Sequence, residues 1–337
     1  MKTFIGVVIA IICFMLMIIS HEAGHFFAGK AMGMQINEFS CGMGPLIWSK
    51  KKGETQYSLR AIPLGGYCAF EAEDEKSDNP RAFVNQTWWS KILVLLCGPF
   101  TNIVIGILIL TLLFVSLGFS TTTIDRVVDG CPAQQAGIQA GDVIISINGV
   151  NVDSWTAAQT EIANTKDDKL DISVERGNDV IDFYQVDTYI NDYGNKAIGI
   201  YSRASHDVGK AFKAGLKETA LIGISIRDFF VSLFSGKASA DDVTGIVGIV
   251  AVMGESYKAG IENFIYLIAL ITANLGYMNL LPIPALDGGR ILIILIDKIS
   301  GGRLSGKAES IINGIGMALL LALMVFMLFK DTIALFK

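Results

Sequence analysis

The sequence contains few charged residues and few of the residues that commonly form metal sites or disulfides. Asp, Glu, Lys and Arg make up only 18% of its 337 residues, and the formal net charge is −5. Nucleic-acid binding relies on an excess of basic side chains, so this balance argues against a nucleic-acid partner. The five cysteines include no CxxC pair, which gives no indication of a disulfide framework or a thiolate zinc site. Histidine occurs only three times.

The sequence contains long apolar stretches. Hydrophobic residues make up 52% of the chain and the mean hydropathy is +0.50, values typical of a polytopic membrane protein that carries some soluble mass. A membrane-spanning helix needs about 20 apolar residues. Four segments approach that length: residues 4–31, 92–119, 264–281 and 311–329. Two shorter runs, residues 243–253 and 291–296, fit interfacial or re-entrant segments better.

The distribution of basic residues predicts how these spans are oriented. Lys and Arg gather between the first and second spans and again between the third and fourth, and loops of this kind face the cytoplasm. We therefore expect both termini, and the long segment of residues 120–260, on the outer side of the plasma membrane. The first span could also be a secretory signal peptide, but no small-residue cleavage site follows it, so it is interpreted as a retained helix.

The most specific motif lies at the cytoplasmic end of the first span. His21-Glu22-Ala23-Gly24-His25 reads HExxH and uses two of the three histidines. On a helix, His21 and His25 fall on one face within reach of one zinc ion, and Glu22 lies beside the metal-bound water. The plain alternative is a pair of satisfied helix histidines with a solvated glutamate. It fits poorly in a membrane, where an ionisable residue costs about 2.5–3.5 kcal/mol and rarely lacks a partner or a function.

A catalytic zinc site of this kind needs a third protein ligand and one position left for water. Glu38, Glu71 and Glu73 are downstream carboxylates, but they belong to a charged loop where exposure to solvent explains them. Asp287 lies in residues 279–289, where two prolines and two glycines interrupt an apolar span. Irregular backbone at membrane depth is tolerated only where it is buried in protein or lines a polar cavity, so Asp287 is predicted as the third ligand. The alternative is that Asp287 caps the following helix.

Residues 120–203 have a different composition. Short β-like runs, turn signals and more charge predict a folded soluble module. Within it, Pro132 can open a short helix, Gly137 can end that helix, and Asn148-Gly149 favours a hairpin turn. Residues 132–149 resemble the PDZ family, in particular the motif PAxxAGLxxGDxIxxING of bacterial protease PDZ modules. The PDZ family binds extended peptides by adding a strand to a sheet edge.

The PDZ resemblance implies one inserted α+β PDZ domain. Its peptide-binding loop corresponds to Ala197-Ile198-Gly199-Ile200, so Ile198 and Gly199 are expected to contact a peptide. A small β domain that acts only as a steric filter above the membrane is the alternative.

Residues 208–233 carry apolar side chains every three or four positions, interleaved with basic ones, which predicts an amphipathic helix. It suits a membrane surface, and packing against the PDZ-like module is the alternative. The chain is thus expected to have four parts. They are residues 1–119 with two spans, HExxH and a cytoplasmic membrane-associated β region; residues 120–203 with the PDZ domain; residues 204–260 with amphipathic and interfacial helices; and residues 261–337 with the last two spans.

HExxH in the first span, the PDZ-like insert and the NxxPxxxLDG pattern at residues 279–288 together resemble the site-2 protease family of intramembrane zinc metalloproteases. The resemblance is to its bacterial PDZ-containing branch, of the regulator of sigma-E protease type. It implies that His21, His25 and Asp287 bind one zinc ion per chain and that Glu22 is the general base. Three further residues are implied to shape the substrate cleft: Asn274, Asn279 and Pro282.

Shorter stretches match the family as well. Gly42-Met43-Gly44-Pro45 and residues 62–67 correspond to membrane-associated β structure that offers an edge for an unwound substrate, so Gly42, Met43 and Gly44 are expected to contact it. The chain departs from the family at residues 244–249, which lack the proline of the usual SGPVGI. It also has room for only one PDZ module, whereas well-known relatives carry two in tandem.

The resemblance implies hydrolysis of a peptide bond within or beside a transmembrane helix. Family members cut anti-sigma factors, membrane-bound regulators and remnant signal peptides in regulated intramembrane proteolysis, so single-pass membrane proteins in the lipid bilayer are the expected partners. The sequence does not choose among these substrates and gives no oligomeric state. Two other classes remain open: a catalytically inactive, membrane-tethered PDZ scaffold, and a transporter whose broken helix binds an ion. Intact HExxH and LDG argue against the first, and the absence of an evident repeated half argues against the second.

Overall fold

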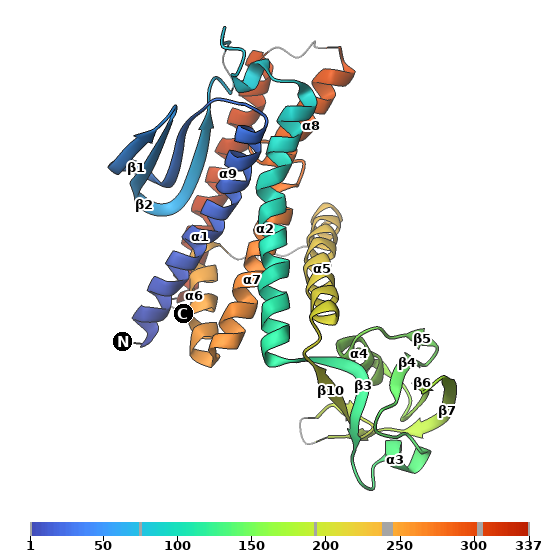
Figure 1. The fold of residues 1–337 in the computed structure, drawn as a ribbon. Helices are drawn as coiled ribbons and strands as arrows, with labels where there is room; N and C mark the ends of the chain where they lie inside the picture. The colour runs from blue at the N-terminus through green and yellow to red at the C-terminus, as the bar shows by residue number, and fades with distance from the viewer. Residues whose placement is uncertain (1, 74–75, 192–193, 238–244, 302–305, 336–337) are drawn as a thin grey trace. The chain divides into compact units, whose positions relative to one another are not determined.

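The computed structural model describes residues 2–73, 76–191, 194–237, 245–301 and 306–335. The chain forms two compact units, coloured along the sequence in Figure 1. The first unit contains the chain up to Leu110 and again from Gly215 onward, and the second contains Thr111–Ala214. The second unit is therefore an insertion within the first.

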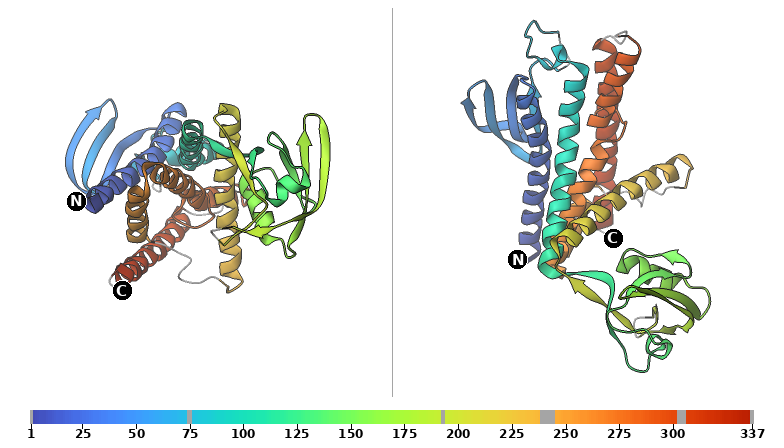
Figure 2. Two further views of the ribbon diagram at one scale, coloured as in Figure 1. Left: turned by 90° about the horizontal axis from the view of Figure 1, so that it is seen from below. Right: turned by 45° about the vertical axis from the view of Figure 1, so that its right-hand side comes forward.

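Among the described residues, four helices are long and apolar enough to cross a membrane. They lie within α1 (Lys2–Ala31), α2 (Trp88–Leu117), α7 (Ile261–Asn279) and α9 (Gly306–Leu335). Figure 2 shows that α1, α2 and α9 run along a common direction. Each of the four apolar runs predicted from the sequence therefore corresponds to a helix that is a candidate membrane span.

A small sheet follows α1 and lies beside it (Figure 1). Its strands β1 (Ile36–Lys52) and β2 (Thr55–Phe70) pair antiparallel and are long and bent. The first part of β1 lies between two parts of β2, since Phe39 is opposite both Cys68 and Tyr57. Gly42 has a φ of +85° at the bend, which glycine adopts without strain. This folding leaves residues 66–70 of β2 as an edge, paired on one side only within the described parts of the chain.

The shorter helices of the first unit include η1 (Phe83–Asn85), α6 (Ile246–Ala259) and α8 (Asp287–Ile299). The apolar run at residues 291–296 is part of α8, and the run at residues 243–253 is mostly α6. Residues 243 and 244 lie outside the described residues. The Gly248 amide of α6 donates to Oδ2 of Asp331 at 2.8 Å, so a carboxylate from α9 satisfies the start of a helix that lacks the proline of the family motif.

The predicted amphipathic segment is helix α5 (Val208–Phe234). Within the first unit, Gly223 of α5 packs against the ring of Tyr277 from α7. Tyr266 of α7 also donates from its hydroxyl to Glu218 at 3.3 Å. The part of α5 that belongs to the first unit therefore packs on a membrane-spanning helix.

The second unit is built on a sheet in the order β10-β3-β4-β6-β7, with β5 paired to β4. Its strands are β3 (Phe119–Val127), β4 (Val143–Ile147), β5 (Val150–Asn151), β6 (Lys169–Arg176), β7 (Asp179–Asp187) and β10 (Ile200–Ser205). β8 (Tyr189–Ile190) pairs with β9 (Lys196–Ala197), and the helices are α3 (Pro132–Ala136) and α4 (Trp155–Asn164). Alternate residues of β6, namely Leu170, Ile172 and Val174, are buried in its core.

Local signals in this unit are confirmed. Pro132 begins α3, and Gly137 ends it in the left-handed conformation with a φ of +91°. Asn148 and Gly149 also have positive φ, +51° and +77°, and connect β4 to β5. That combination is the one a two-residue hairpin with a type I′ turn requires.

Candidate metal centre and active site

Helix α1 presents His21 and His25 on one face, as their spacing of four residues dictates. The two Nε2 atoms lie 3.1 Å apart, and the rings meet edge to face with centroids 4.7 Å apart. Both residues are buried, each with 7% of its surface exposed. Two imidazole nitrogens therefore converge on one point inside the helix bundle.

The carboxylate of Asp287 lies at the point where the two imidazole nitrogens converge. Its Oδ2 lies 3.1 Å from Nε2 of His21 and 3.4 Å from Nε2 of His25. Asp287 is the first residue of α8, and Leu286 occupies the N-cap position without a side-chain capping bond. The alternative use of Asp287 as a helix cap is therefore not what the structure shows.

This arrangement fits a tetrahedral metal ion. Zn–N and Zn–O bonds of about 2.0–2.1 Å give ligand-to-ligand distances of about 3.3 Å in a tetrahedron, close to the three distances observed. Oδ2 of Asp287 is buried and has no partner with hydrogen-bond geometry among the described residues. A buried carboxylate oxygen that faces two imidazole nitrogens without a hydrogen bond indicates a cation site. Two histidines and one carboxylate are also a usual catalytic zinc set.

Close helix packing orients His25. Its Nδ1 lies 2.8 Å from the carbonyl oxygen of Val94 on α2 and donates to it, which turns Nε2 toward the cluster. The imidazole lies against Gly98, where an added Cβ would come within 2.3 Å of Nε2. On α1, an added Cβ at Gly24 would come within 2.4 Å of the Cys97 carbonyl oxygen. Small residues at these positions let α1 and α2 approach closely enough for the ring to reach Val94.

Glu22 faces the edge of the small sheet. The backbone amide of Cys68 interacts with its carboxylate. An added Cβ at Gly66 would meet Cγ of Glu22 at 3.6 Å, so residues 66–70 of β2 pass directly beside this side chain. Glu22 therefore lies close both to residues 66–70 and to His21, His25 and Asp287, the candidate metal-binding cluster.

Helix α8 is fixed at its start by two glycines. An added Cβ would lie 2.2 Å from the Leu280 carbonyl oxygen at Gly288, and 2.0 Å from the Ile283 carbonyl oxygen at Gly289. Neither position can accept a larger residue without moving the turn. The turn contains a second constraint, because Ala285 has a φ of +75°. The interrupted apolar span is thus a tight re-entry that places Asp287 at the cluster.

Known proteins of one family are similar to this chain over most of its length. The model of Peptidase family M50 matches residues 9–323. The chain belongs to this family, the site-2 proteases. It is 35% identical to a provisionally named zinc metalloprotease of Clostridium acetobutylicum over 336 residues, covering 98% of both chains. A protein with the same provisional name in Clostridium perfringens is 34% identical, covering 97% of this chain and 98% of its own.

A third relative, a provisionally named zinc metalloprotease of Staphylococcus aureus strain N315, is 27% identical over 422 aligned positions, covering 98% of this chain and 99% of its own. Membership and these relatives make the chain a zinc-dependent M50 metalloprotease. With its four long apolar helices, it is a multi-pass membrane protein.

The other carboxylates considered from the sequence have different partners in this M50 peptidase. Glu38 binds Arg60 at 2.8 Å, and Glu71 accepts a hydrogen bond from Asn37. Burial would raise the pKa of Glu38, but hydrogen bonds from Ser58 and Arg60 outweigh that effect and hold it below its usual range. Among the described residues, the cluster with metal-ligand spacing consists of His21, His25 and Asp287.

The residues expected to shape the cleft lie on either side of the re-entry. Asn274 is exposed on α7, and Asn279 ends that helix with its side-chain amide bonded to the Leu275 carbonyl at 3.0 Å. Pro282 is exposed in the turn before α8. Within the described parts of the chain, no hydrogen bond joins these residues to the metal-binding cluster.

The β-structure residues lie at the bend of β1. Gly42 is buried, and an added Cβ there would come within 2.8 Å of the Ile62 carbonyl oxygen. Met43 is 45% exposed, and its side chain covers Gly65 of β2. Gly44 is exposed, with a φ of +79°. In the part of the chain that the structure describes, no hydrogen bond or ion pair joins these three residues to the cluster.

In the second unit, a cavity of about 860 Å³ lies between α4 and β10. Ile198 and Gly199 line one end of it, although the Ile198 side chain is buried in the core. Their carbonyl oxygens accept hydrogen bonds from Ala133 at 2.9 Å and Val128 at 2.8 Å, respectively. The loop expected to bind peptide therefore borders a groove, and it offers backbone rather than side-chain groups there.

Proposed function

We propose that this M50 metalloprotease hydrolyses peptide bonds in or beside the transmembrane segments of single-pass membrane proteins. The observation that carries the proposal is the convergence of His21, His25 and Asp287 within 3.4 Å of one another, with Glu22 beside them. Three ligands from two helices leave one tetrahedral position for water, which is the arrangement of a catalytic rather than a structural zinc site.

In this proposal, Nε2 of His21, Nε2 of His25 and the carboxylate of Asp287 hold the zinc ion. When bound, zinc lowers the pKa of water and polarises the scissile carbonyl. Glu22 accepts the proton of the attacking water and delivers it to the nitrogen of the leaving amine. The Val94 carbonyl holds the tautomer of His25 that keeps Nε2 available for the metal.

The substrate must lose its helical hydrogen bonds before it can be cut, and we assign residues 66–70 to replacing them. This stretch is an edge of the small sheet and passes beside Glu22. An unwound substrate segment added to that edge would regain backbone hydrogen bonds next to the general base, from groups other than the Cys68 and Phe70 amides, which contact Glu22 and Glu73. Gly42, Met43 and Gly44 would line its path at the bend, and Asn274, Asn279 and Pro282 would border the cleft on the side of α7.

We further propose that residues 120–203 act as a PDZ domain. Strand β10 pairs with β3, and its other edge has no partner strand among the described residues. In a trans peptide the N–H points opposite to the C=O, so the N–H groups of Gly199 and Ile200 face away from their carbonyl-bonded neighbours. An extended peptide or its terminal carboxylate in the groove along α4 would accept hydrogen bonds from them.

Basic loops place the HExxH end of α1 at the cytoplasmic side of the plasma membrane in this proposal, with the termini and the PDZ domain outside. Anti-sigma factors and remnant signal peptides are the substrate types proposed, as steps of regulated intramembrane proteolysis. Both are single-pass helices, which suits a site that takes two of its residues from the candidate membrane-spanning helix α1.

The direct test is cleavage of a purified single-pass protein by Glu22→Gln. We expect zinc content equal to that of wild type and a rate lower by about 100- to 10,000-fold, since Glu22 supplies general acid–base catalysis. Glu262→Gln on α7 is the matched control and should cut at the wild-type rate. A variant lacking Glu22 that cuts as fast as wild type would contradict the mechanism. Carefully prepared wild type that contains no zinc, and that cuts nothing after zinc is added, would favour the scaffold.

A further inference from the structure

The proposed metal centre joins two parts of the chain that are far apart in sequence. His21 and His25 come from α1, and Asp287 comes from α8. Gly288 and Gly289 fix α8 to the turn before it, but that turn belongs to the same segment and does not attach α8 to α1. Something else must hold Asp287 against the two histidines when no metal is present.

An ion pair provides this link. Arg290 follows Asp287 by three residues, about one helical turn, and its Nη1 lies 2.9 Å from Oε2 of Glu73. The other carboxylate oxygen of Glu73 accepts a hydrogen bond from the Phe70 amide at 3.1 Å. Both oxygens of Glu73 are thus engaged, one by α8 and one by the end of β2.

Phe70 continues the link to α1. Its ring lies against Gly29, where an added Cβ would come within 2.4 Å of Cε1, so ring and helix backbone are in direct contact. Gly29 follows His25 by one helical turn, as Arg290 follows Asp287. The two sides of the metal centre are therefore connected through Gly29, Phe70 and Glu73.

Phe83 of η1 supports the ion pair from the side. Its ring centroid lies 5.3 Å from the Arg290 guanidinium, 5.7 Å from the Lys91 ammonium and 5.4 Å from the Phe70 ring centroid. Phe83 is 4% exposed, so the cation–π contact with Arg290 is partly shielded from water.

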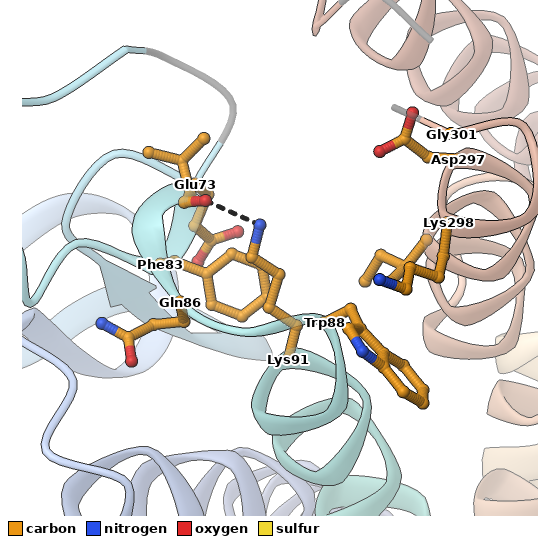
Figure 3. A pocket seen from close by; sticks show the side chains of 10 residues that line it. Glu73, Phe83, Gln86, Trp88, Lys91, Asp297, Lys298 and Gly301 are labelled. Carbon is orange, nitrogen blue, oxygen red and sulfur yellow. Dashed lines mark hydrogen bonds between the residues drawn. The ribbon is translucent and has the colours of Figure 1, made fainter. Parts of the chain in front are cut away.

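The C-terminal half of α8 borders a cavity. A cavity of about 480 Å³ separates the start of α2 from the C-terminal half of α8, and its lining includes Trp88, Lys91, Ile294, Asp297 and Lys298. Figure 3 shows Glu73 and Phe83 on one side of this cavity, with Asp297 and Lys298 across from them. The cavity leaves one side of the C-terminal half of α8 unpacked, whereas Gly288, Gly289 and Ile293 in its first two turns are buried.

We propose that Arg290 and Glu73 are positioning residues that hold the start of α8, and with it Asp287, in place for metal binding. The inference rests on the proposed metal centre. The side chains of Arg290 and Glu73 are 20% and 26% exposed, and ion pairs of this kind add little to global stability. The effect should therefore appear in the geometry and metal affinity of the site rather than in the melting temperature.

The test uses full-length protein in detergent, with zinc binding measured by chelator competition and hydrogen exchange measured on the zinc-free form. Arg290→Ala should raise the zinc dissociation constant by about tenfold, the lower end of the range for residues that support metal ligands. It should also speed amide exchange at residues 287–291. Glu73→Gln, which keeps an acceptor for the Phe70 amide, should have the same effects. Arg290→Lys should restore most of the affinity, because a single donor forms the observed bond.

Two controls make the result specific. Arg81→Ala removes another arginine–glutamate pair of the same region, with Glu54, and should leave zinc affinity and exchange at residues 287–291 unchanged. The double variant Arg290→Ala with Glu73→Gln should be no worse than either single variant, since both remove one interaction. Additive losses, wild-type behaviour of both single variants, or an equal loss in Arg81→Ala would each overturn the inference.

A separate variant, Asp287→Asn, tests the proposed metal centre itself. If Asp287→Asn retained zinc as tightly as wild type, the assignment of Asp287 as a ligand would be wrong. Hydrogen exchange of the zinc-free Arg290→Ala protein would still report whether the ion pair holds the start of α8.

Discussion

Nδ1 of His25 donates to the Val94 carbonyl oxygen over 2.8 Å, and this contact decides which nitrogen of the ring faces the metal-binding cluster. A backbone carbonyl of α2 accepts only from a protonated nitrogen, so it favours the tautomer with a lone pair on Nε2. The contact exists because glycines at positions 24 and 98 let the two helices approach. Several expectations can be tested from this arrangement.

Gly98→Ala should displace His25. An added Cβ would come within 2.3 Å of Nε2 of the ring, closer than any stable contact allows. We expect a loss of zinc affinity and of cleavage by about 10–100-fold, as for other disturbances of the groups around a metal ligand. Gly314→Ala on α9 is the matched control, since an added Cβ meets no atom within 4 Å there. Wild-type zinc content in Gly98→Ala, measured after gel filtration, would be inconsistent with this geometry.

Removing zinc should destabilise the protein. A ligand that binds only the folded state contributes about 2.7 kcal/mol at 100 times its dissociation constant. Chelation should therefore lower the melting temperature of the wild type in detergent, and added zinc should restore it. In Asp287→Asn, both effects should be much smaller, because one of three ligands is lost. An equal zinc response in the two proteins would exclude Asp287 from the site.

Acid should weaken the second unit through Asp142. Burial alone would raise the pKa of this carboxyl, but hydrogen bonds from Arg176 and from the Gln139 amide hold it below its usual range. A carboxyl with a lowered pKa stabilises the fold above its unfolded pKa of about 4, and this contribution is lost as the pH falls further.

Asp142→Asn should cost about 1–3 kcal/mol at neutral pH, because it removes the buried charged acceptor of the hydrogen bonds from Arg176 and the Gln139 amide. It should also make the unit less sensitive to acid below about pH 4 than the wild type is. Hydrogen exchange of residues 120–203 in the full-length protein measures both. If the opening free energy, obtained after correction for the intrinsic exchange rate at each pH, fell as steeply with acid in the variant as in the wild type, Asp142 would not be the titrating group.

The groove of the second unit can be closed by one substitution. Ala163 of α4 is exposed and lines the cavity, so Ala163→Trp should fill part of it. We expect slower binding and cleavage of substrates that bind the proposed PDZ domain, and an unchanged rate on a short substrate without the segment that binds there. Asn164→Trp places the same side chain at an exposed neighbouring position outside the cavity lining and serves as the control. If Ala163→Trp slows neither substrate, the unit acts as a steric filter only.

The spans and the cluster could be predicted because their signals are local. Apolar runs of sufficient length give helices, and a spacing of four places His21 and His25 on one face. Pro282, Pro284 and the two glycines marked the interruption before α8, although their tight fit against the Leu280 and Ile283 carbonyls needs the structure.

Other features could not be predicted from the sequence, for physical reasons. The contact between the Val94 carbonyl and His25 could not be predicted, because a backbone carbonyl is the same for every residue type. Glu73 and Arg290 are 217 positions apart, and each is an ordinary loop or interfacial charge until the fold brings them together. The bent pairing of β1, with Phe39 opposite two parts of β2, likewise depends on tertiary structure rather than on alternation along a strand.

The candidate metal ligands lie far apart in the sequence, so they are synthesised at different times. About 260 residues separate His25 from Asp287, which a ribosome adding about 5–20 residues per second would need roughly 13–50 s to make. During that interval the nascent chain carries only two of the three proposed ligands. Newly inserted molecules would therefore be inert toward neighbouring helices at the translocon until Asp287 has been made, even if no inhibitor is present.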